Sequence, residues 1–329
     1  MPSSLLEIRD LSVEFSARKR VIRALRNVNL TIPKGSIVGI VGESGCGKST
    51  LARVMAGLLP PHEGQVLLDG QQLAGSLRNR RRSELQKIQF VFQMADTALN
   101  PRHRIEKILG RPIEFYTGKT GAEKRQRIAE LLDMVELPRA FATRYPDELS
   151  GGQKQRVNLA RALAADPEVL LCDEVISALD TIVGANVIEL LKRLRLQTGV
   201  SFVFISHDLS TVASFADHIV VLYAGRVVEQ GRTDEVLSPP SHPYTRLLVS
   251  SVPELRIGWL EEAMATQEAQ AGIDREVTLT KVGCPFYDRC PQGIPGTCDK
   301  VVPPVRELEH RHKIECHLDI DALPAQVGR

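Results

Sequence analysis

Residues 42–49 form a glycine-rich run, GESGCGKS, that matches the phosphate-binding pattern G-x-x-x-x-G-K-[ST] at every fixed position. Glycines let the backbone turn tightly so that its N–H groups point at phosphate oxygens, and the helix that follows adds its positive N-terminal end. Lys48 is expected to reach the β- and γ-phosphates of a nucleotide, and Ser49 to ligate Mg²⁺. Cys46 fills a variable position, and its side chain is given no role. The predicted nucleotide-contacting residues of this run are Gly42, Ser44, Gly45, Cys46, Gly47, Lys48, Ser49 and Thr50.

Two acidic residues at the end of an apolar run supply the second part of such a site. Residues 169–174 read VLLCDE, which is typical of a buried strand that ends in two carboxylates. Asp173 is expected to hold Mg²⁺ through water, and Glu174 to act as the general base that orients an attacking water. Two surface acids at a strand end are the plain structural alternative, but a phosphate-binding loop in the same chain favours hydrolysis.

Four cysteines near the end of the chain form a second group of potential ligands: Cys284, Cys290, Cys298 and Cys316. Five, seven and seventeen residues separate them in turn, unlike the C-x₂-C pairs of most structural zinc sites. Four thiolates can hold a [4Fe–4S] cluster or a tetrahedral zinc ion. Reduced thiols that pack a small lobe, or a disulfide formed on purification, are the alternatives without a metal.

Strands and helices must alternate along the chain to position these residues. We predict strands at 6–15, 28–32, 36–41, 62–70, 169–172 and 201–205, helices at 49–59, 183–195 and 244–251, and a hairpin over 219–231. Residues 94–165 follow a mainly helical pattern, and residues 261–276 are expected to form a linker or a mobile helix. Because strands alternate with helices, the fold class is predicted to be α/β with a parallel sheet.

Charge and hydropathy exclude several classes of protein. The chain of 329 residues carries 42 basic and 40 acidic side chains, and its net charge of +2 gives no reason to expect nucleic-acid binding. The longest apolar runs are strand-sized, far below the roughly 20 residues of a membrane-spanning helix. The first ten residues lack the pattern of a secretory signal. We therefore expect a cytoplasmic protein whose six cysteines stay reduced.

The run Leu149-Ser150-Gly151-Gly152-Gln153, followed by a basic helix, resembles the signature of ATP-binding cassette (ABC) ATPases when it is taken with the phosphate loop. The resemblance implies that this helix start faces the phosphate loop of a second cassette. Ser150, Gly151, Gly152 and Gln153 would then contact ATP across a dimer. A glycine loop capped by Ser150 describes the same local geometry without a ligand.

Other residues match elements of the same family in the same order. Gln93 is similar to the glutamine that contacts Mg²⁺ and the water, and His207 to the histidine that contacts the γ-phosphate. Asp180, in the run SALD, is similar to the aspartate of the loop that crosses the dimer interface. Phe15 is the candidate for the aromatic side chain that stacks on adenine, although a phenylalanine that ends a strand more often belongs to a core.

One departure from the family pattern follows the catalytic acid. The family has proline and a small hydroxyl residue at the positions after the glutamate, and this chain has Val175 and Ile176. Since Glu174 and Asp180 are both present, hydrolysis is still expected. The connection between these two acids is expected to be shaped differently, with an effect on the rate.

Three segments, two of them in the last third of the chain, narrow the resemblance to one subgroup of the family. The run HPYTRLL at 242–248 and the run ALNP at 98–101 resemble segments of the ATPases of oligopeptide and dipeptide importers, as does the four-cysteine region. This resemblance favours a [4Fe–4S] cluster, with zinc as the alternative, on Cys284, Cys290, Cys298 and Cys316. The role is expected to be structural, because a region with few large apolar residues builds little core of its own.

The resemblance implies an α/β P-loop NTPase fold of the ABC cassette type: a RecA-like parallel core, an antiparallel β-subdomain, an inserted helical subdomain and a C-terminal cysteine-rich extension. The cassette is expected at residues 1–235, its helical subdomain at about 94–160, and the extension at 236–329.

The implied function is ATP hydrolysis, with Mg²⁺, that powers the import of peptides or related small solutes. The implied partners are a second ABC ATPase (a related paralogue rather than a second copy), two membrane permease subunits and an extracytoplasmic solute-binding protein, but no nucleic acid. The protein would be peripheral, at the cytoplasmic face of the inner membrane. A non-transport ABC ATPase of a soluble assembly such as carbon–phosphorus lyase is the alternative.

Overall fold

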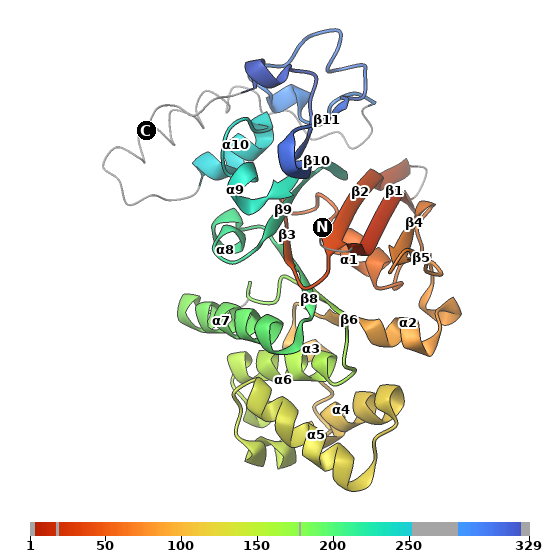
Figure 1. The fold of residues 1–329 in the computed structure, drawn as a ribbon, viewed down its shortest axis with the longest axis vertical. Helices are drawn as coiled ribbons and strands as arrows, with labels where there is room; N and C mark the ends of the chain where they lie inside the picture. Colours follow the sequence, from red (N-terminus) through yellow and green to blue (C-terminus); the bar gives the residue numbers. More distant parts are fainter. Residues whose placement is uncertain (1–3, 18–19, 178, 252–281, 324–329) are drawn as a thin grey trace.

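The computed structural model describes residues 4–17, 20–177, 179–251 and 282–323, so the linker expected at 261–276 lies outside the described residues. Within them the chain forms two β-sheets with helices packed around them (Figure 1). The first sheet is antiparallel, in the strand order β2-β1-β4-β5. Its strands are β1 (Ser4–Ala17), β2 (Arg20–Pro33), β4 (Glu63–Leu68) and β5 (Gln71–Gln72).

The second sheet follows the order β11-β12-β10-β9-β3-β8-β7-β6 in the described part of the chain. Its inner strands, from β6 to β9 in that order, are parallel, which confirms the predicted α/β class. Strands β3, β7 and β8 are buried along their whole length, as expected of continuous apolar runs. The strands are β3 (Ile37–Val41), β6 (Ile88–Val91), β7 (Val169–Asp173), β8 (Ser201–Ser206), β9 (His218–Tyr223), β10 (Arg226–Arg232), β11 (Val305–Glu307) and β12 (Lys313–Glu315).

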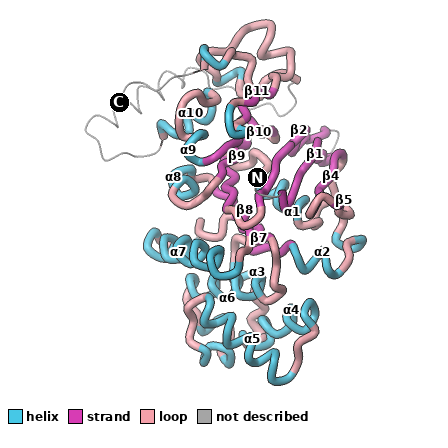
Figure 2. Tube along the Cα trace, in the orientation of Figure 1, coloured by secondary structure: helices cyan, strands magenta, loops and turns pink. Residues whose placement is uncertain are grey.

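Helices gather at the end of the molecule opposite the C-terminal segment (Figures 1 and 2). The region expected to be a helical subdomain contains α3, α4, α5 and most of α6, which pack on one another. None of the helices in the described ranges combines the length and the apolar composition needed to cross a bilayer. The helices are α1 (Lys48–Met55), α2 (Arg82–Lys87), α3 (Ala95–Ala98), α4 (Ile105–Pro112), α5 (Gly121–Met134), α6 (Gly151–Leu163), α7 (Thr181–Thr198), α8 (Leu209–Ala213), α9 (Thr233–Val236) and α10 (Pro243–Ser250).

The C-terminal segment is joined to the main sheet. Strand β12 pairs with β10, and β11 pairs with β12, so the two tail strands extend the sheet at one edge. Cys284, Phe286 and Cys298 are buried in the same apolar cluster as the inner strands. A separate small cluster holds Ile314 and Cys316. The segment therefore obtains most of its burial from the cassette. The sequence pattern missed β11 and β12, because strands of three residues carry little periodicity.

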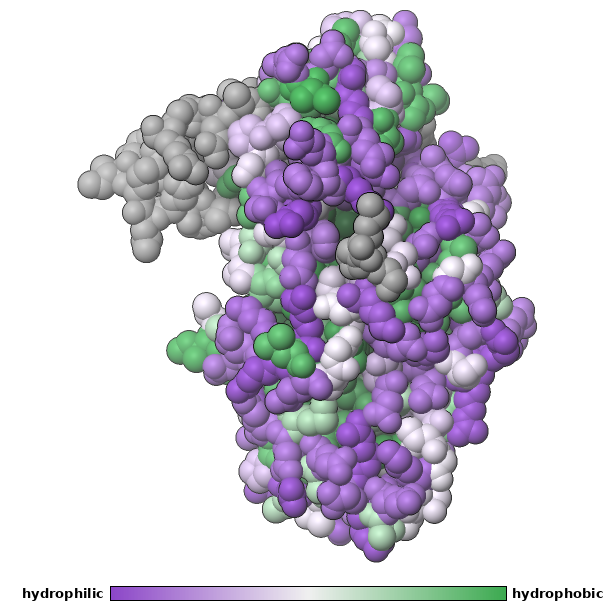
Figure 3. Space-filling view, in the orientation of Figure 1, coloured by the Kyte–Doolittle hydropathy of each residue, from purple (hydrophilic) through white to green (hydrophobic). Residues whose placement is uncertain are grey.

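The molecular surface is mainly hydrophilic on the face drawn in Figure 3, and its hydrophobic residues form separate groups. One group lies over the C-terminal segment, where Val301, Val302 and Val305 are exposed. The segment thus buries Phe286 and three of its four cysteines while these valines remain on the outside.

Candidate functional site

The glycine-rich run forms a loop between β3 and α1. Gly42 and Gly47 have backbone φ angles of 152° and 111°. A Cβ atom on Gly42 would lie 2.1 Å from the carbonyl oxygen of Leu222, and one on Gly47 would lie 2.6 Å from that of Ala24. Because neither position has room for a side chain, only glycine lets the loop lie this close to the neighbouring backbone.

Lys48 lies at the start of α1, with its ammonium group turned back into the loop. The residue is buried, and its Nζ donates hydrogen bonds to the carbonyl oxygens of Gly42 (2.7 Å) and Glu43 (2.9 Å). Because both acceptors are uncharged, the positive charge remains available for an anionic ligand. The loop thus combines a buried cation with the start of a helix, which is the arrangement that binds phosphate.

Ser49 and Asp173 meet although they come from different elements. The Oγ of Ser49, in α1, donates a hydrogen bond of 2.8 Å to Oδ1 of Asp173, the last residue of β7. Burial raises the pKa of the Asp173 carboxyl, and the hydrogen bond from Ser49 opposes this shift. A hydroxyl and a carboxylate are oxygen ligands of the kind that Mg²⁺ prefers. The pair can therefore hold this cation beside the phosphate loop.

The three residues expected to act on water lie together after the ends of β6, β7 and β8. The Nε2 of Gln93 donates to Oε2 of Glu174 at 3.0 Å, and Nδ1 of His207 lies 3.7 Å from Oε1 of the same carboxylate. Glu174 has a positive φ of 48°, a backbone conformation that costs energy outside glycine and often marks functional sites. His207 is more exposed than Glu174, at 60% against 21% of the side chain. The hydrogen bond from Gln93 therefore holds the carboxylate, His207 lies near its other oxygen, and solvent can still reach it.

The two unusual residues after Glu174 are accommodated by the core. Val175 is buried, and Ile176 packs against the main apolar cluster. The N–H and the Oγ of Ser177 both donate to the carbonyl oxygen of Glu174, at 3.1 and 2.9 Å. The turn that follows the acid is therefore closed by Ser177. Further along, the carboxylate of Asp180 accepts a backbone N–H and so caps α7.

The predicted signature forms the start of α6. The Oγ of Ser150 accepts from the N–H of Gln153 (3.4 Å), and the Gln153 side chain accepts from the N–H of Ser150 (3.1 Å). Gly152 packs against Val183 of α7 so closely that a Cβ atom would lie 2.6 Å from Cγ1 of that valine. Gly151 is exposed, and the space around it is open. This helix start therefore presents its serine and its backbone to the outside.

Phe15 lies near the end of β1 and pairs with Ile22 of β2. Its side chain is 41% exposed, so it does not belong to a core, which was the structural alternative considered for it. Ile22 and Val21 are also exposed. An exposed aromatic ring with apolar neighbours is suited to stacking on a flat ligand.

Three cysteines of the C-terminal segment, Cys284, Cys290 and Cys298, lie in or against the main apolar cluster, and Cys316 lies in the small one. Burial, with a smaller contribution from other thiols of the group, raises the pKa of Cys284 to about 12 and that of Cys290 to about 11. The N–H of Cys284 donates to the carbonyl oxygen of Cys298 at 2.7 Å, which joins two loops of the segment. No three His, Cys, Asp or Glu side chains among the described residues form a compact site for a single metal ion.

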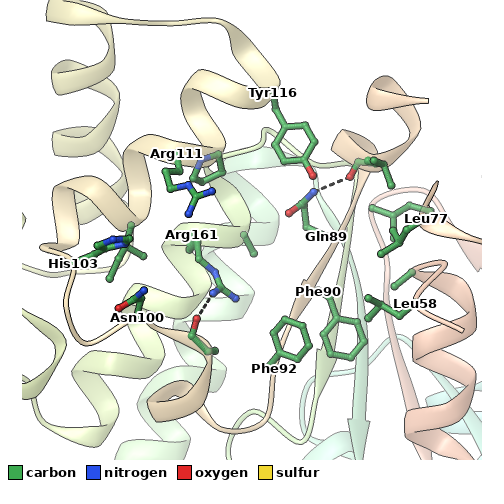
Figure 4. Close-up of a pocket in the computed structure, with 17 residues that line it drawn as sticks. Leu58, Leu77, Gln89, Phe90, Phe92, Asn100, His103, Arg111, Tyr116 and Arg161 are labelled. Carbon is green, nitrogen blue, oxygen red and sulfur yellow. Dashed lines mark hydrogen bonds between the residues drawn. The ribbon is translucent and has the colours of Figure 1, made fainter. Parts of the chain in front are cut away.

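A cavity of about 430 Å³ opens between the helical region and the edge of the main sheet (Figure 4). Apolar side chains, among them Leu58, Phe90 and Phe92, line the side of β6 and α1. Polar side chains line the helical side, among them Arg111 and Arg161. A partner with both apolar and acidic groups would be complementary to this lining.

Sequence reasoning gave no role to several residues that contact the site. Ser177 accepts a hydrogen bond from Gln93 (3.2 Å), and Tyr244 and Arg289 both contact Glu43 of the phosphate loop. The HPYT run could have directed attention to Tyr244. Glu43 occupies a variable position of the loop pattern, which carries no signal of its own.

Two protein families match this chain. The ABC transporter family matches residues 25–177, and the family described as oligopeptide/dipeptide transporter, C-terminal region, matches residues 228–298. A Brucella abortus (strain 2308) protein named for ATP binding in peptide import is 41% identical over 310 residues, which is 94% of this chain and 90% of that protein. The oligopeptide transport ATP-binding protein AppF of Bacillus subtilis (strain 168) is 37% identical over 96% of this chain and 97% of its own length.

Solved structures that are similar to this chain include ATP-binding cassettes. The dimeric post-hydrolysis structure of the cassette MJ0796, bound to ADP and Pi, has a TM-score of 0.62 and 34% identity, and covers 70% of this chain and 99% of that one. The cassette cbiO1 from Clostridium perfringens has a TM-score of 0.66 and 26% identity, and covers 80% of this chain and 99% of its own.

Proposed function

The chain belongs to the ABC transporter ATPases that carry the C-terminal region of oligopeptide and dipeptide transporters, and from this premise we propose that it is the ATP-hydrolysing subunit of an importer. The cargo is peptides or related small solutes, which pass through separate permease subunits. The observation that carries the proposal is the convergence of Gln93 and His207 on Glu174, directly after the Ser49–Asp173 pair. Relatives of nearly full length are named for peptide transport, so a carbon–phosphorus lyase partner is not favoured.

The phosphates of ATP are assigned to the loop at residues 42–50. The backbone N–H groups of this loop and the ammonium group of Lys48 would bind and orient them. Mg²⁺, when bound, neutralises charge that develops on the phosphates. Ser49 and Asp173 would hold this cation, with the side-chain oxygen of Gln93 as a further ligand. The hydrogen-bonded hydroxyl and buried carboxylate support this assignment.

Glu174 is assigned the role of general base. Its carboxylate would accept a proton from the water that attacks the γ-phosphate, and Gln93 would orient this water and the carboxylate. His207 is exposed enough to turn toward the γ-phosphate. The contacts of the carboxylate with both residues support these roles.

Two cassettes are proposed to close around ATP. The exposed signature run, Ser150 to Gln153, and Asp180 at the start of α7 can be reached by a second chain. A similar cassette, MJ0796, has been solved as a dimer. We favour a related paralogue as the second cassette, on the family resemblance. The exposed ring of Phe15 is the proposed adenine contact.

The cavity of Figure 4 is the proposed docking site of a permease subunit. It lies beside Gln93, because Phe90 and Phe92 of its wall lead into that residue. A permease segment bound there would therefore act directly on the residue that contacts Glu174. Two permease subunits would place the protein at the cytoplasmic face of the inner membrane, and an extracytoplasmic solute-binding protein would deliver the cargo.

The C-terminal extension is proposed to bind a [4Fe–4S] cluster through Cys284, Cys290, Cys298 and Cys316. The donor set is of the type that holds such a cluster, since all four residues are free cysteines of one segment. We propose residues 1–235 as the cassette, with a helical subdomain at about 94–160, and residues 236–329 as the extension.

Hydrolysis is tested with the purified full-length chain. The Glu174→Gln variant should bind ATP with unchanged affinity and lose about 10²–10⁴-fold in turnover, the range typical of a general base. The matched control is Glu189→Gln, which changes an exposed acid on α7 that pairs with Lys192. Turnover in Glu174→Gln close to that of the control would refute the assignment. Peptide uptake by a strain in which the chain has been deleted, with and without this variant, tests the transport role.

The cluster is tested by measuring iron, acid-labile sulfide and zinc in protein purified without oxygen. About four irons with matching sulfide per chain are expected. The Cys284→Ser variant should lose them, and Cys172→Ser, which changes a buried cysteine of β7 outside the group, should retain them. If zinc is found in place of iron, the proposed cluster is replaced by a zinc site. If neither metal is found, the four cysteines are packing residues.

A further inference from the structure

Glu43, at a variable position of the phosphate loop, is held by two residues from outside the cassette core. The hydroxyl of Tyr244 accepts a hydrogen bond from the Glu43 N–H at 3.0 Å. The Nη1 of Arg289 donates to both carboxylate oxygens of Glu43, at 2.9 and 3.0 Å. Tyr244 belongs to α10, and Arg289 to the cysteine segment. Two separate parts of the C-terminal region therefore contact one residue of the phosphate loop.

These two side chains are themselves fixed by aromatic packing. The rings of Tyr223 and Tyr244 lie 4.5 Å apart between centroids, and the buried ring of Phe286 lies 5.3 and 5.4 Å from them. The guanidinium group of Arg289 lies 5.8 Å from the Phe286 ring and 3.4 Å from the Tyr223 hydroxyl. Its position is therefore set by a packed cluster rather than by a mobile side chain alone.

The arginine sits on a short turn between two of the cysteines. The N–H of Tyr287 donates to the carbonyl oxygen of Cys284, and that of Cys290 to the carbonyl oxygen of Tyr287. Phe286 and Arg289 thus project from a turn whose ends are Cys284 and Cys290. Whatever fixes these cysteines also fixes the arginine.

The contacts to Glu43 constrain the loop where Lys48 is held. The carbonyl oxygen of Glu43 accepts from Lys48 Nζ, while its N–H and its carboxylate are bonded to the C-terminal region. All three hydrogen-bonding parts of one residue are therefore engaged. A rotation of the Glu43 peptide would break bonds on both sides. Restricting a binding loop in this way lowers the ordering cost that a ligand must meet.

We propose that Tyr244 and Arg289 are positioning residues for the phosphate loop, through which the cysteine segment sets the affinity of the cassette for nucleotide. The proposal rests on the proposed function only in taking the ligand to be ATP. The Arg289–Glu43 ion pair is partly exposed, at 29% and 41% of the side chains, so its direct contribution to global stability is small. Its effect should therefore fall on nucleotide binding and leave the fold intact.

The test measures binding of a fluorescent ATP analogue to the full-length chain, without relying on turnover. Glu43→Gln and Arg289→Ala should each weaken binding about 10-fold, equivalent to about 1.4 kcal/mol. Tyr244→Phe, which removes only the acceptor of the Glu43 N–H, should speed amide hydrogen exchange in the loop. The matched control is Arg232→Ala, which removes an exposed arginine paired with Asp234.

A charge swap separates positioning from a general effect of charge. Glu43→Arg combined with Arg289→Glu should recover most of the affinity that either single change loses. Binding and loop exchange unchanged in Glu43→Gln and Arg289→Ala would overturn the proposal, as would failure of the swap to recover any affinity. Because these readouts do not need hydrolysis, they stay separate from the Glu174→Gln experiment, whose failure would refute the proposed function instead.

Discussion

Removing Arg226 should reveal that the C-terminal segment is part of the cassette fold. Arg226 lies at the start of β10, and its guanidinium group bonds the carboxylate of Glu315 at the end of β12. Both side chains are nearly buried, with 11% and 9% of their surface exposed. Only two residue pairs join β10 to β12 directly, Glu229 with Ile314 and Gln230 with Lys313. The ion pair is therefore one of a few buried polar contacts between the tail hairpin and the sheet, beside that of His312 Nε2 with Glu229 Oε1 at 2.8 Å.

The expected cost follows from the burial of the pair. Deleting one member of a buried ion pair costs about 3–5 kcal/mol, because the other charge is left without a partner. Burial raises the pKa of Glu315, and Arg226 opposes the shift, so without Arg226 this pKa should rise further. The carboxyl can then take up a proton, which favours the lower end of the range. That is still a large part of the roughly 5–15 kcal/mol that stabilises a typical domain.

Urea unfolding of Arg226→Ala, followed by circular dichroism and by hydrogen exchange at residues 305–315, measures the loss. The control is Lys313→Ala on the same hairpin, since Lys313 and Glu307 form an exposed pair with an N–O distance of 3.8 Å. Exposed pairs are worth about 0–1 kcal/mol. A double variant, Arg226→Met with Glu315→Leu, should return close to the parent stability. A loss below about 1 kcal/mol in Arg226→Ala, or melting of the hairpin in a separate early transition, would refute this account.

Two further predictions concern the loop and the network behind it. Gly42→Ala should abolish tight nucleotide binding, because its Cβ would lie 2.1 Å from the Leu222 carbonyl oxygen. Gly45→Ala meets open space and carries only the backbone strain of a φ of 79°, so it should lose less; calorimetric titration with ATP compares the two variants. Burial lowers the pKa of His242 to about 3 in the folded chain, whereas its pKa in the unfolded chain is about 6.5. Between these two values the unfolded chain binds more protons than the folded chain. The free energy of unfolding therefore falls as the pH drops through this window. In His242→Asn the free energy of unfolding, measured in urea, should differ less between pH 7 and pH 5 than in the parent. An equal difference in both proteins would contradict the prediction.

The sequence alone predicted those parts of the site whose residues are close neighbours along the chain. A phosphate loop needs its glycines, Lys48 and Ser49 at fixed spacing, so the pattern alone located it. Asp173 and Glu174 could be found because the apolar run of β7 leads directly into them, Asp173 being the last residue of the strand. The family resemblance then added Gln93, which meets Glu174 in the structure although 81 positions separate them.

Contacts made by isolated residues could not be predicted in this way. Arg226 and Glu315 lie 89 positions apart, and neither stands in a pattern that requires the other. Glu43 occupies a position where the loop pattern allows any residue, and Arg289 lies 246 positions further along. Such pairs depend on tertiary packing, which single-sequence periodicity does not record. The strand β6 was missed for a related reason, because its four residues are followed at once by the polar Gln93 region.

The β9–β10 hairpin connects the tail to the phosphate loop by a second route. Its turn donates the Gly225 N–H to the carbonyl oxygen of Cys46 (2.9 Å), and the Leu222 carbonyl of β9 lies against Gly42. The same hairpin holds β12 through Arg226. Loosening the tail strands should therefore disturb the phosphate loop through the β9–β10 hairpin, whereas loss of Arg289 removes only the contact with Glu43.

The two routes predict different results for two variants. Arg226→Ala should lower both the free energy of unfolding and the affinity for nucleotide, because the hairpin supports the loop and the tail together. Arg289→Ala should lower the affinity alone, because its ion pair with Glu43 is partly exposed. Fluorescent-nucleotide titration and urea unfolding of the same two preparations would show this. If Arg226→Ala lowered the free energy of unfolding but left the affinity for nucleotide unchanged, the hairpin would stabilise the fold without supporting the loop. The C-terminal region would then act on the phosphate loop solely through Arg289 and Tyr244.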